Sequence, residues 1–188
     1  MKNKWLILAV LLPISSFSQG KTKQGFQAIV SAGVAMGEST AKPLAQVGAG
    51  FRYSRFYTGL GIGIDNYRLK SIPLFADWKM YMGQRQAIFV FANGGYNFSY
   101  GNSKQKINSL STNNQYYGGL YFDAGMGYRF RLNQGHRLAI SAGYSQKNIM
   151  NKADYTVPCF NGPCNFEVHR NYFNLARMTA KLSWEFGY

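Results

Sequence analysis

The sequence has few acidic residues, few cysteines and no long hydrophobic run. Its 188 residues include 7 Asp and Glu, 21 Lys and Arg, and 2 Cys. No stretch is continuously apolar over the roughly 18 residues that a membrane-spanning helix requires, which excludes a bundle of such helices. Charged residues make up 15% of the chain, against about 25% in a typical soluble domain. The surface is therefore short of charge for a protein that meets water on all sides.

The N-terminal segment has the features of a secretory signal peptide. Two lysines precede an apolar run at residues 5–14, and the small residues Ser16 and Ser18 suit a cleavage site after residue 18. This run is too short to cross a bilayer as a helix. We therefore expect residues 1–18 to be removed and residues 19–188 to form one exported domain.

The shortage of acidic residues leaves a formal net charge of +14. Such a charge favours anionic partners. An exported chain rarely meets nucleic acid, so the phosphates of membrane lipid and lipopolysaccharide are the expected partners, and no nucleic-acid partner is expected.

The two cysteines, Cys159 and Cys164, lie in one predicted loop on either side of an Asn-Gly-Pro turn signal. In an exported protein a disulfide between them is the expected state. His169 and Glu167 are nearby, but together with the cysteines they match no known spacing of metal ligands. We expect neither a metal nor a cofactor.

Apolar and polar residues alternate in most of the chain, most regularly between Ala176 and Tyr188. Successive side chains of a strand point to opposite faces, so each alternating segment has one apolar and one polar side. Turn signals separate eight such segments. The pattern predicts strands at 25–36, 44–54, 57–66, 72–82, 87–100, 117–131, 136–148 and 171–187.

The predicted connections alternate in length. This asymmetry is typical of a bacterial transmembrane barrel, which has short periplasmic turns and longer extracellular loops. An even number of strands places both termini in the periplasm. The tight connections are 54–56, 83–86 and 132–135, the long ones 101–116 and 149–170, and the intermediate ones 37–43 and 67–71.

A soluble barrel of the lipocalin kind would show the same alternation with the apolar face inward. Two observations favour the membrane. The polar face carries many glycines, which weaken a solvent-facing strand but suit a crowded lumen. Aromatic residues gather at both ends of the apolar face, as at two membrane interfaces. These glycines are Gly48, Gly50, Gly59, Gly61, Gly63, Gly95, Gly125, Gly127 and Gly143, and the aromatics are Phe51, Tyr53, Tyr128, Phe130, Trp184, Phe186 and Tyr188 at one end, and Tyr96, Phe98, Tyr100, Tyr144 and Tyr172 at the other.

The stretch Ser71–Tyr81 (SIPLFADWKMY) and the segment Gly59–Asp65 (GLGIGID) resemble sequences of a known family. The chain is similar to small outer-membrane β-barrel proteins of the OmpA/OmpX type, in particular the porin-like barrels of Bacteroidota. The resemblance implies an eight-stranded antiparallel up-and-down transmembrane β-barrel, and it carries no catalytic residues. It also implies that the barrel-assembly machinery reads the terminal strand, with Trp184, Phe186 and Tyr188 as the signal.

Charged residues on the polar face should pair across the lumen, because buried charges are costly unless they are paired. We expect Asp77 and Asp123 to meet Lys79, Arg177 and Lys181, and Glu185 to meet Arg129 or Arg131. Such a network could plug the barrel or line a narrow pore that favours anions. The predicted interior charges are Arg52, Asp65, Asp77, Lys79, Asp123, Arg129, Arg131, Arg137, Lys147, Arg177, Lys181 and Glu185.

Two further functions stay open. A hydrolase would need a nucleophile and a base in reach, and a His169–Glu167 pair with a loop serine could supply them. A non-enzymatic protein is expected. The loops could instead bind a surface partner or another outer-membrane protein. Basic loop residues would face lipopolysaccharide phosphates, namely Arg68, Lys70, Lys104, Lys106, Lys152 and Arg170.

Overall fold

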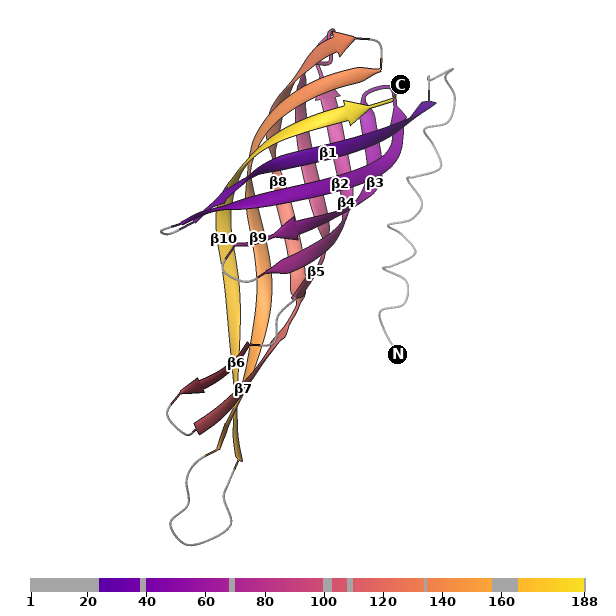
Figure 1. The fold of residues 1–188 in the computed structure, drawn as a ribbon. Coiled ribbons are helices and arrows are strands. Elements are labelled where there is room, and N and C mark those ends of the chain that lie inside the picture. The colour runs from indigo at the N-terminus through magenta and orange to yellow at the C-terminus, as the bar shows by residue number, and fades with distance from the viewer. Residues whose placement is uncertain are drawn as a thin grey trace, which may run out of the picture.

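The computed structural model is an antiparallel β-barrel with a projecting arm of strands (Figure 1). It describes residues 24–37, 40–67, 70–99, 103–107, 110–133, 135–156 and 166–187. None of these segments forms a helix with the length and apolarity of a membrane span. The predicted signal peptide, Cys159, Cys164, Arg68, Tyr100 and Tyr188 lie outside the described residues.

Eight strands close into the barrel, which confirms the predicted fold class. Each strand pairs antiparallel with its neighbours in the order β1-β2-β3-β4-β5-β8-β9-β10, and β10 pairs back onto β1. Closure leaves no unpaired edge along this part of the sheet. The strands are β1 (Gln24–Met36), β2 (Ala41–Tyr53), β3 (Phe56–Asp65), β4 (Ser71–Met82), β5 (Ile88–Ser99), β8 (Gly119–Asn133), β9 (His136–Thr156) and β10 (Phe166–Phe186).

One end of the barrel, here called the turn end, carries the tight connections β2–β3, β4–β5 and β8–β9. Gly83 and Gly135 have φ angles of 79° and 86° in these turns, a backbone conformation that glycine adopts without steric cost. The C-terminus lies at this end (Figure 1). The positions of the three tight turns agree with the sequence prediction.

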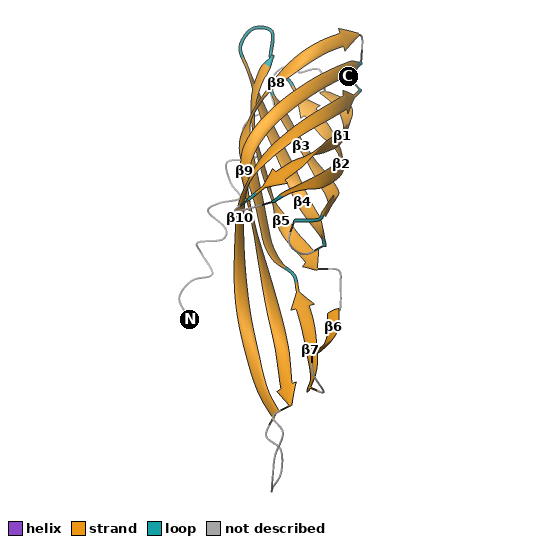
Figure 2. Cartoon of the chain, turned by 60° about the vertical axis from the view of Figure 1, so that its left-hand side comes forward, coloured by secondary structure: helices purple, strands orange, loops and turns teal. Residues whose placement is uncertain are grey.

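The opposite end extends into an arm, where the structure differs from the sequence prediction. The expected loop 101–116 contains a hairpin of β6 (Ser103–Ile107) and β7 (Leu110–Tyr117). The expected loop 149–170 is largely strand, because β9 and β10 keep pairing from Ile149↔Phe173 to Thr156↔Phe166. β7 pairs with the outer part of β9. The arm, β6 and β7 with 150–156 of β9 and 166–172 of β10, projects beyond the barrel (Figure 2).

A β-bulge joins the arm to the barrel. From Tyr117 to Tyr121 the chain takes four steps, whereas the opposing residues of β9 run only from Met150 to Lys147. Gly118 and Gly119 supply the extra residue, as bulges in antiparallel pairs do. A Cβ on Gly118 would lie 1.8 Å from the carbonyl oxygen of Asn97, so this close approach requires glycine.

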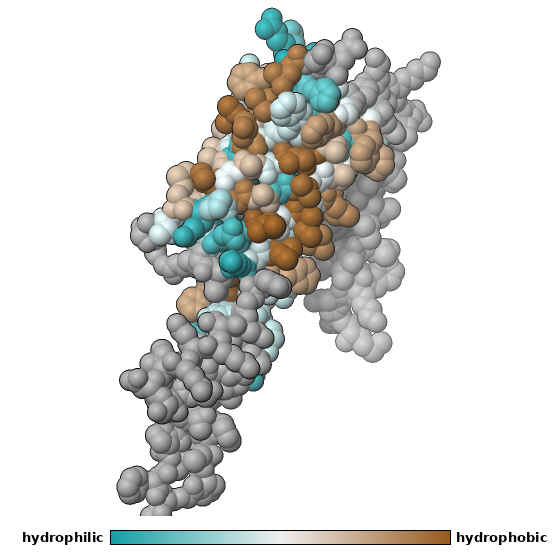
Figure 3. All heavy atoms as spheres, viewed as in Figure 1, coloured by the Kyte–Doolittle hydropathy of each residue, from teal (hydrophilic) through white to brown (hydrophobic). Residues whose placement is uncertain are grey.

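The outside of the barrel is apolar. Large hydrophobic side chains from every barrel strand are exposed, among them Leu60 at 68%, Leu120 at 70% and Met126 at 65%. Figure 3 shows apolar residues gathered over one face of the barrel. The described aromatics of both predicted belts are exposed at their respective ends. A surface of this kind suits contact with lipid and not with water.

Candidate functional site in the barrel interior

Alternation along each strand places the polar side chains in the lumen. Asp65 on β3, Asp77 and Lys79 on β4, and Arg177 and Lys181 on β10 are all buried. Their sequence neighbours face outward, as the burial patterns of β3 and β4 show. The lumen therefore holds the polar residues, and hydrogen bonds and ion pairs must satisfy them there.

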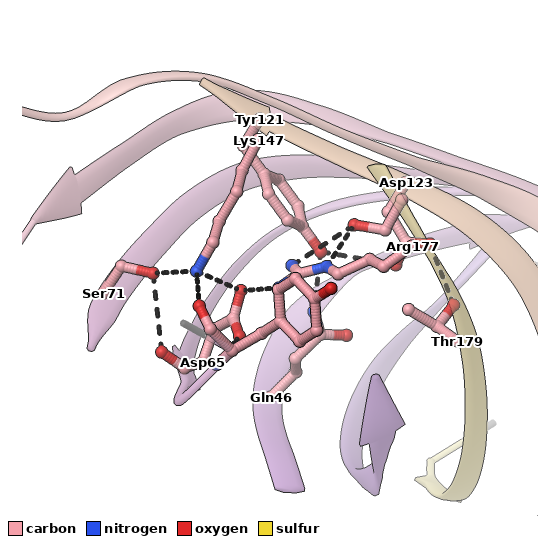
Figure 4. A network of polar contacts seen from close by, with 10 residues as sticks. Gln46, Asp65, Ser71, Tyr121, Asp123, Lys147, Arg177 and Thr179 are labelled. Atoms are coloured by element: carbon pink, nitrogen blue, oxygen red, sulfur yellow. Dashed lines mark hydrogen bonds and ion pairs between the residues drawn. The ribbon is translucent and has the colours of Figure 1, made fainter. Parts of the chain in front are cut away.

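At the arm end of the lumen, Asp65 accepts contacts from two cations (Figure 4). Its Oδ2 lies 3.2 Å from Lys147 Nζ and also pairs with Arg177 Nη1. Lys147 Nζ donates to Ser71 Oγ at 3.1 Å and to the carbonyl oxygen of Tyr67 at 2.8 Å. The Tyr67 backbone N–H donates to Asp65 Oδ1 at 2.9 Å. One carboxylate thus holds three strands and the end of a loop together.

In the middle of the lumen, Asp123 is the centre of a second network (Figure 4). Lys181 Nζ lies 2.6 Å from Asp123 Oδ2. Thr179 Oγ1 donates to Oδ1 and the Tyr121 hydroxyl donates to Oδ2, both at 3.3 Å. Gln46 Nε2 donates to the Tyr121 hydroxyl at 3.0 Å. The network crosses from β8 to β10 and to β2 on the far wall.

At the turn end, Glu185 is fully buried and meets two basic side chains. Lys79 Nζ lies 3.5 Å from Oε1, and Arg129 Nη1 lies 3.6 Å from Oε2. The Tyr81 hydroxyl donates to Oε1 at 3.3 Å. The guanidinium groups of Arg52 and Arg129 lie 4.4 Å and 4.1 Å from the centre of the Tyr81 ring. Such cation–π contacts add to the ion pairs where water is excluded.

The structure places the predicted interior residues as follows. Arg129 pairs with Glu185 and Lys181 with Asp123, whereas Arg177 pairs with Asp65. Arg52 bonds to Gln86 Oε1 and to the carbonyl oxygen of Ser54. The Asn93 side-chain nitrogen donates to Asp77 Oδ1 at 2.9 Å, in the amide orientation that also lets it donate to the carbonyl oxygen of Ala92. Arg131 is exposed at the turn end.

Sequence reasoning missed the tyrosines of the lumen. Tyr81 and Tyr121 are buried and donate to Glu185 and Asp123. Their positions alternate in register with Lys79 and Asp123, so the period-2 pattern would have placed them inside. Tyrosine is expected mainly on the lipid-facing side of a barrel, and for this reason the alternation at these two positions was not used.

At three of the interior glycines an aromatic ring, and not a water-filled cavity, occupies the space that the missing side chain leaves. A Cβ on Gly61 would lie 2.5 Å from the ring of Phe75, and one on Gly127 would lie 2.4 Å from the ring of Phe89. Gly143 stands in the same relation to Phe91, at 2.9 Å. Inward aromatic rings therefore occupy the room that the glycines provide.

One cavity in the described part of the lumen is small. It measures about 20 Å³ and lies beside Asp77, Lys79, Asn93 and Lys181. This volume holds about one water molecule. The lumen of an eight-stranded barrel is in general just wide enough for side chains to fill it.

The other predicted site residues lie away from the lumen. Trp184 and Phe186 stack at 6.1 Å on the outside of the turn end, and Trp184 Nε1 donates to His136 Nδ1 at 3.4 Å. Lys70 and Arg170 are exposed at the arm end, and Lys152 is half-buried. Lys104 and Lys106 lie in β6. Among the described residues, no three His, Cys, Asp or Glu side chains come together as metal ligands would.

Comparisons with known proteins bear on the fold. No known protein family and no curated protein matches the sequence. The outer membrane protein AlkL, solved in lipid bilayers, superposes with a TM-score of 0.50 at 11% identity, over 91% of this chain and 93% of that chain. The outer membrane protein OprG from Pseudomonas aeruginosa gives a TM-score of 0.49 at 13% identity, over 90% of this chain and 98% of that chain. The strand topology and the superposition on AlkL show that the chain has the fold of a small eight-stranded outer-membrane β-barrel.

Proposed function

We propose that this chain is a non-enzymatic outer-membrane protein in which a plugged barrel anchors an external arm that binds a partner. The observation that carries this proposal is the buried charge network of the lumen. Three buried carboxylates tie the wall strands together through ion pairs, and a cavity beside this network has a volume of about 20 Å³. A barrel closed in this way supports a role as an anchor, a surface-binding protein or an accessory subunit.

The surface of the barrel supports its placement in the outer membrane. The apolar belt and both aromatic ends are exposed, as lipid contact requires. We propose that the turn end and both termini face the periplasm, so that the arm is extracellular. The bases at the arm end, such as Lys70 and Arg170, would then meet lipopolysaccharide phosphates, and Trp184 and Phe186 would serve the barrel-assembly machinery. We also propose that the chain is related to the small barrels of the OmpA/OmpX type and to the porin-like barrels of Bacteroidota.

Planar bilayer recording tests the plug. We expect folded protein to produce no discrete conductance steps. Phe89→Ala with Phe91→Ala is the matched variant, because it removes two rings that fill the lumen, and it should introduce steps. Folding of both proteins is checked by the different gel migration of boiled and unboiled samples. Discrete steps from the unmodified protein would refute the plug.

A narrow pore that favours anions is the second candidate, and the charge of the lumen favours it. Six basic side chains are buried against four acidic ones, namely Arg52, Lys79, Arg129, Lys147, Arg177 and Lys181 against Asp65, Asp77, Asp123 and Glu185. If the barrel conducts, this excess predicts selectivity for chloride over potassium. Lys181→Gln should then reduce the selectivity.

A further inference from the structure

The turn end of the barrel is rich in arginine. The three tight turns and the residues beside them, 50–59, 79–91 and 129–139, contain six arginines, one lysine and no Asp or Glu. Positive charge is therefore concentrated at this end, and such a concentration attracts anions. The arginines are Arg52, Arg129 and Arg137, which are buried or half-buried, and Arg55, Arg85 and Arg131, which are exposed at the three turns.

Two of these arginines lie directly opposite each other. Arg131 of β8 is in register with Arg137 of β9, immediately before a β-bulge that shifts the register between Arg131 and Asn133. Bulges at the rims of barrels change the direction of nearby side chains. Like charges directly opposite each other on neighbouring strands are destabilising. The pair is therefore unfavourable by itself, and an anion between the two guanidinium groups would stabilise it.

Glu185 is too strongly engaged to balance this charge. It lies opposite Arg137 in the β9–β10 ladder, but it is fully buried and shared by Lys79 and Arg129. Arg129 Nη1 makes no hydrogen bond and lies 3.6 Å from the nearer carboxylate oxygen. Arg52 donates to uncharged oxygens. The positive charge at this end thus exceeds that of one carboxylate, and buried charge is costly unless an anion offsets it.

The kind of basic side chain indicates which anion fits. The planar guanidinium group has a fork of N–H donors that matches the oxygens of a phosphate or a carboxylate. A carboxylate offers two oxygens and one negative charge, whereas a phosphate monoester carries a charge of about −1.5 to −2 near pH 7 and has three strong acceptor oxygens. Two opposed guanidinium groups, with Arg129 on the same face of β8, match the phosphate better.

We propose that Arg131 and Arg137 form a binding site for one phosphate group at the rim of the turn end. Both guanidinium groups donate to the phosphate oxygens, and Arg129 adds positive charge from inside the lumen. Phe130, beside Arg131, is exposed and belongs to the aromatic end that marks the membrane surface. At that depth the phosphate can belong to a lipid headgroup or to a soluble molecule. The inference goes beyond the anchoring role and depends neither on the arm nor on the conductance of the lumen.

Isothermal titration calorimetry tests the site with inorganic phosphate and the full chain, folded in phosphate-free maltoside micelles with a constant background of sodium chloride. We expect saturable binding that Arg131→Gln weakens by about tenfold or more. Arg131→Lys should lose part of the affinity, because it keeps the charge without the fork. Arg55→Gln is the matched control, since it removes an exposed arginine from the β2–β3 turn at the same end. It should change the affinity by less than about twofold, because salt screens distant exposed charges.

The stability of the same proteins in urea gives a second readout. Without phosphate, Arg131→Gln should raise the urea midpoint, because it removes the like-charge pair. Phosphate should raise the midpoint of the unmodified protein but not that of the variant, since a ligand stabilises the folded state that binds it. A purely structural role of Arg131 predicts instead a lower midpoint of the variant with and without phosphate, and this result would contradict the site.

Phosphatidylglycerol added to the micelles distinguishes the two sources of the phosphate. If a headgroup occupies the site, the lipid displaces inorganic phosphate, and native mass spectrometry finds less lipid on Arg131→Gln than on the unmodified protein. If a soluble phosphate occupies it, the lipid leaves the binding of inorganic phosphate unchanged.

Two results would overturn the inference. One is the absence of saturable binding of either probe to protein whose folding is verified by heat-modifiable gel migration. The other is equal weakening by Arg131→Gln and Arg55→Gln, which would indicate general attraction to a basic surface. Neither result bears on the plug, which bilayer recording tests separately.

Discussion

Pairs of a glycine and an aromatic ring determine the packing of the lumen at the scale of single residues. The rings of Phe75 and Phe89 lie over Gly61 and Gly127 on the neighbouring strand, and the ring of Phe91 lies over Gly143 two strands away. Without a side chain the backbone lets the ring approach closely, and the ring covers the backbone that the glycine exposes. The rings thus occupy the space beside these three glycines, and the cavity next to Phe75, Phe89 and Phe91 measures about 20 Å³.

Gly127→Ala tests this packing. The added methyl would lie 2.4 Å from the ring of Phe89 and 2.6 Å from the carbonyl oxygen of Ile140, so we expect a loss of about 1–3 kcal/mol in the free energy of unfolding. Gly94→Ala is the matched control, because a Cβ there meets nothing within 4 Å. Urea titration of barrels refolded in vesicles measures both. Equal effects of the two substitutions would contradict the proposed packing.

Removal of Asp65 tests the ion pairs at the arm end. Asp65→Ala leaves Lys147 and Arg177 buried without their shared carboxylate. Breaking a buried pair in this way costs about 3–5 kcal/mol, and we expect a comparable loss in the same urea titration. Asp65→Ala combined with Lys147→Met and Arg177→Met should recover part of it. Lys42→Ala, at an exposed position, should change the stability by less than about 0.5 kcal/mol.

Alternation along the sequence predicts most of the charges that enter the lumen, with Arg131 as an exposed exception, but not which of them meet. Arg177 and Lys181 are four residues apart on the same face of β10, yet Arg177 reaches Asp65 on β3 and Lys181 reaches Asp123 on β8. These partners depend on the tilt and stagger of strands across the barrel, which no local pattern encodes. The same holds for Lys79, whose partner Glu185 lies on β10.

At the scale of strands, the lengths of β9 and β10 exceed what the hydrophobic pattern indicates. Each has 21 residues, whereas about 9–11 suffice to cross the membrane. Outside the hydrocarbon, neither face of a strand has to be apolar. The alternation of apolar and polar residues therefore ends there, although the hydrogen bonds between the backbones of β9 and β10 continue. For the same reason, the sequence pattern predicts a polar loop where the structure has the hairpin of β6 and β7.

The C-terminal strand leads to a prediction about assembly. Phe186→Ser should lower the fraction of the protein that reaches its folded form in the outer membrane of cells, because Phe186 belongs to the expected recognition signal. Leu182→Ser is the matched control, since Leu182 is also exposed on the lipid-facing side of β10. The folded fraction is measured by heat-modifiable migration of membrane extracts. If both purified variants refold equally in vesicles, a defect confined to Phe186→Ser in cells identifies a signal and not a loss of stability.

At the scale of the whole molecule, depth in the membrane determines what each outward position tolerates. Leu60 lies midway along β3 and is 68% exposed, whereas Phe56 begins the strand at the turn end and is 59% exposed. Leu60→Arg should cost about 2–4 kcal/mol and Phe56→Arg about 0–1 kcal/mol, because a charge is tolerated near the interface and not at the midplane. Urea titration in phospholipid vesicles measures the difference. Equal costs would contradict the membrane placement.

The sequence by itself determined the class of fold, the three tight turns and the face of each strand that meets lipid. These features follow from local physics, because alternation, turn residues and outward apolar side chains act within a few neighbouring residues. Only the tertiary structure decided the partner of each buried charge, the packing of aromatic rings against glycines in the lumen, and the pairing of β9 with β10 beyond the barrel. Each of these depends on the register between strands that are distant in sequence, which barrel closure sets.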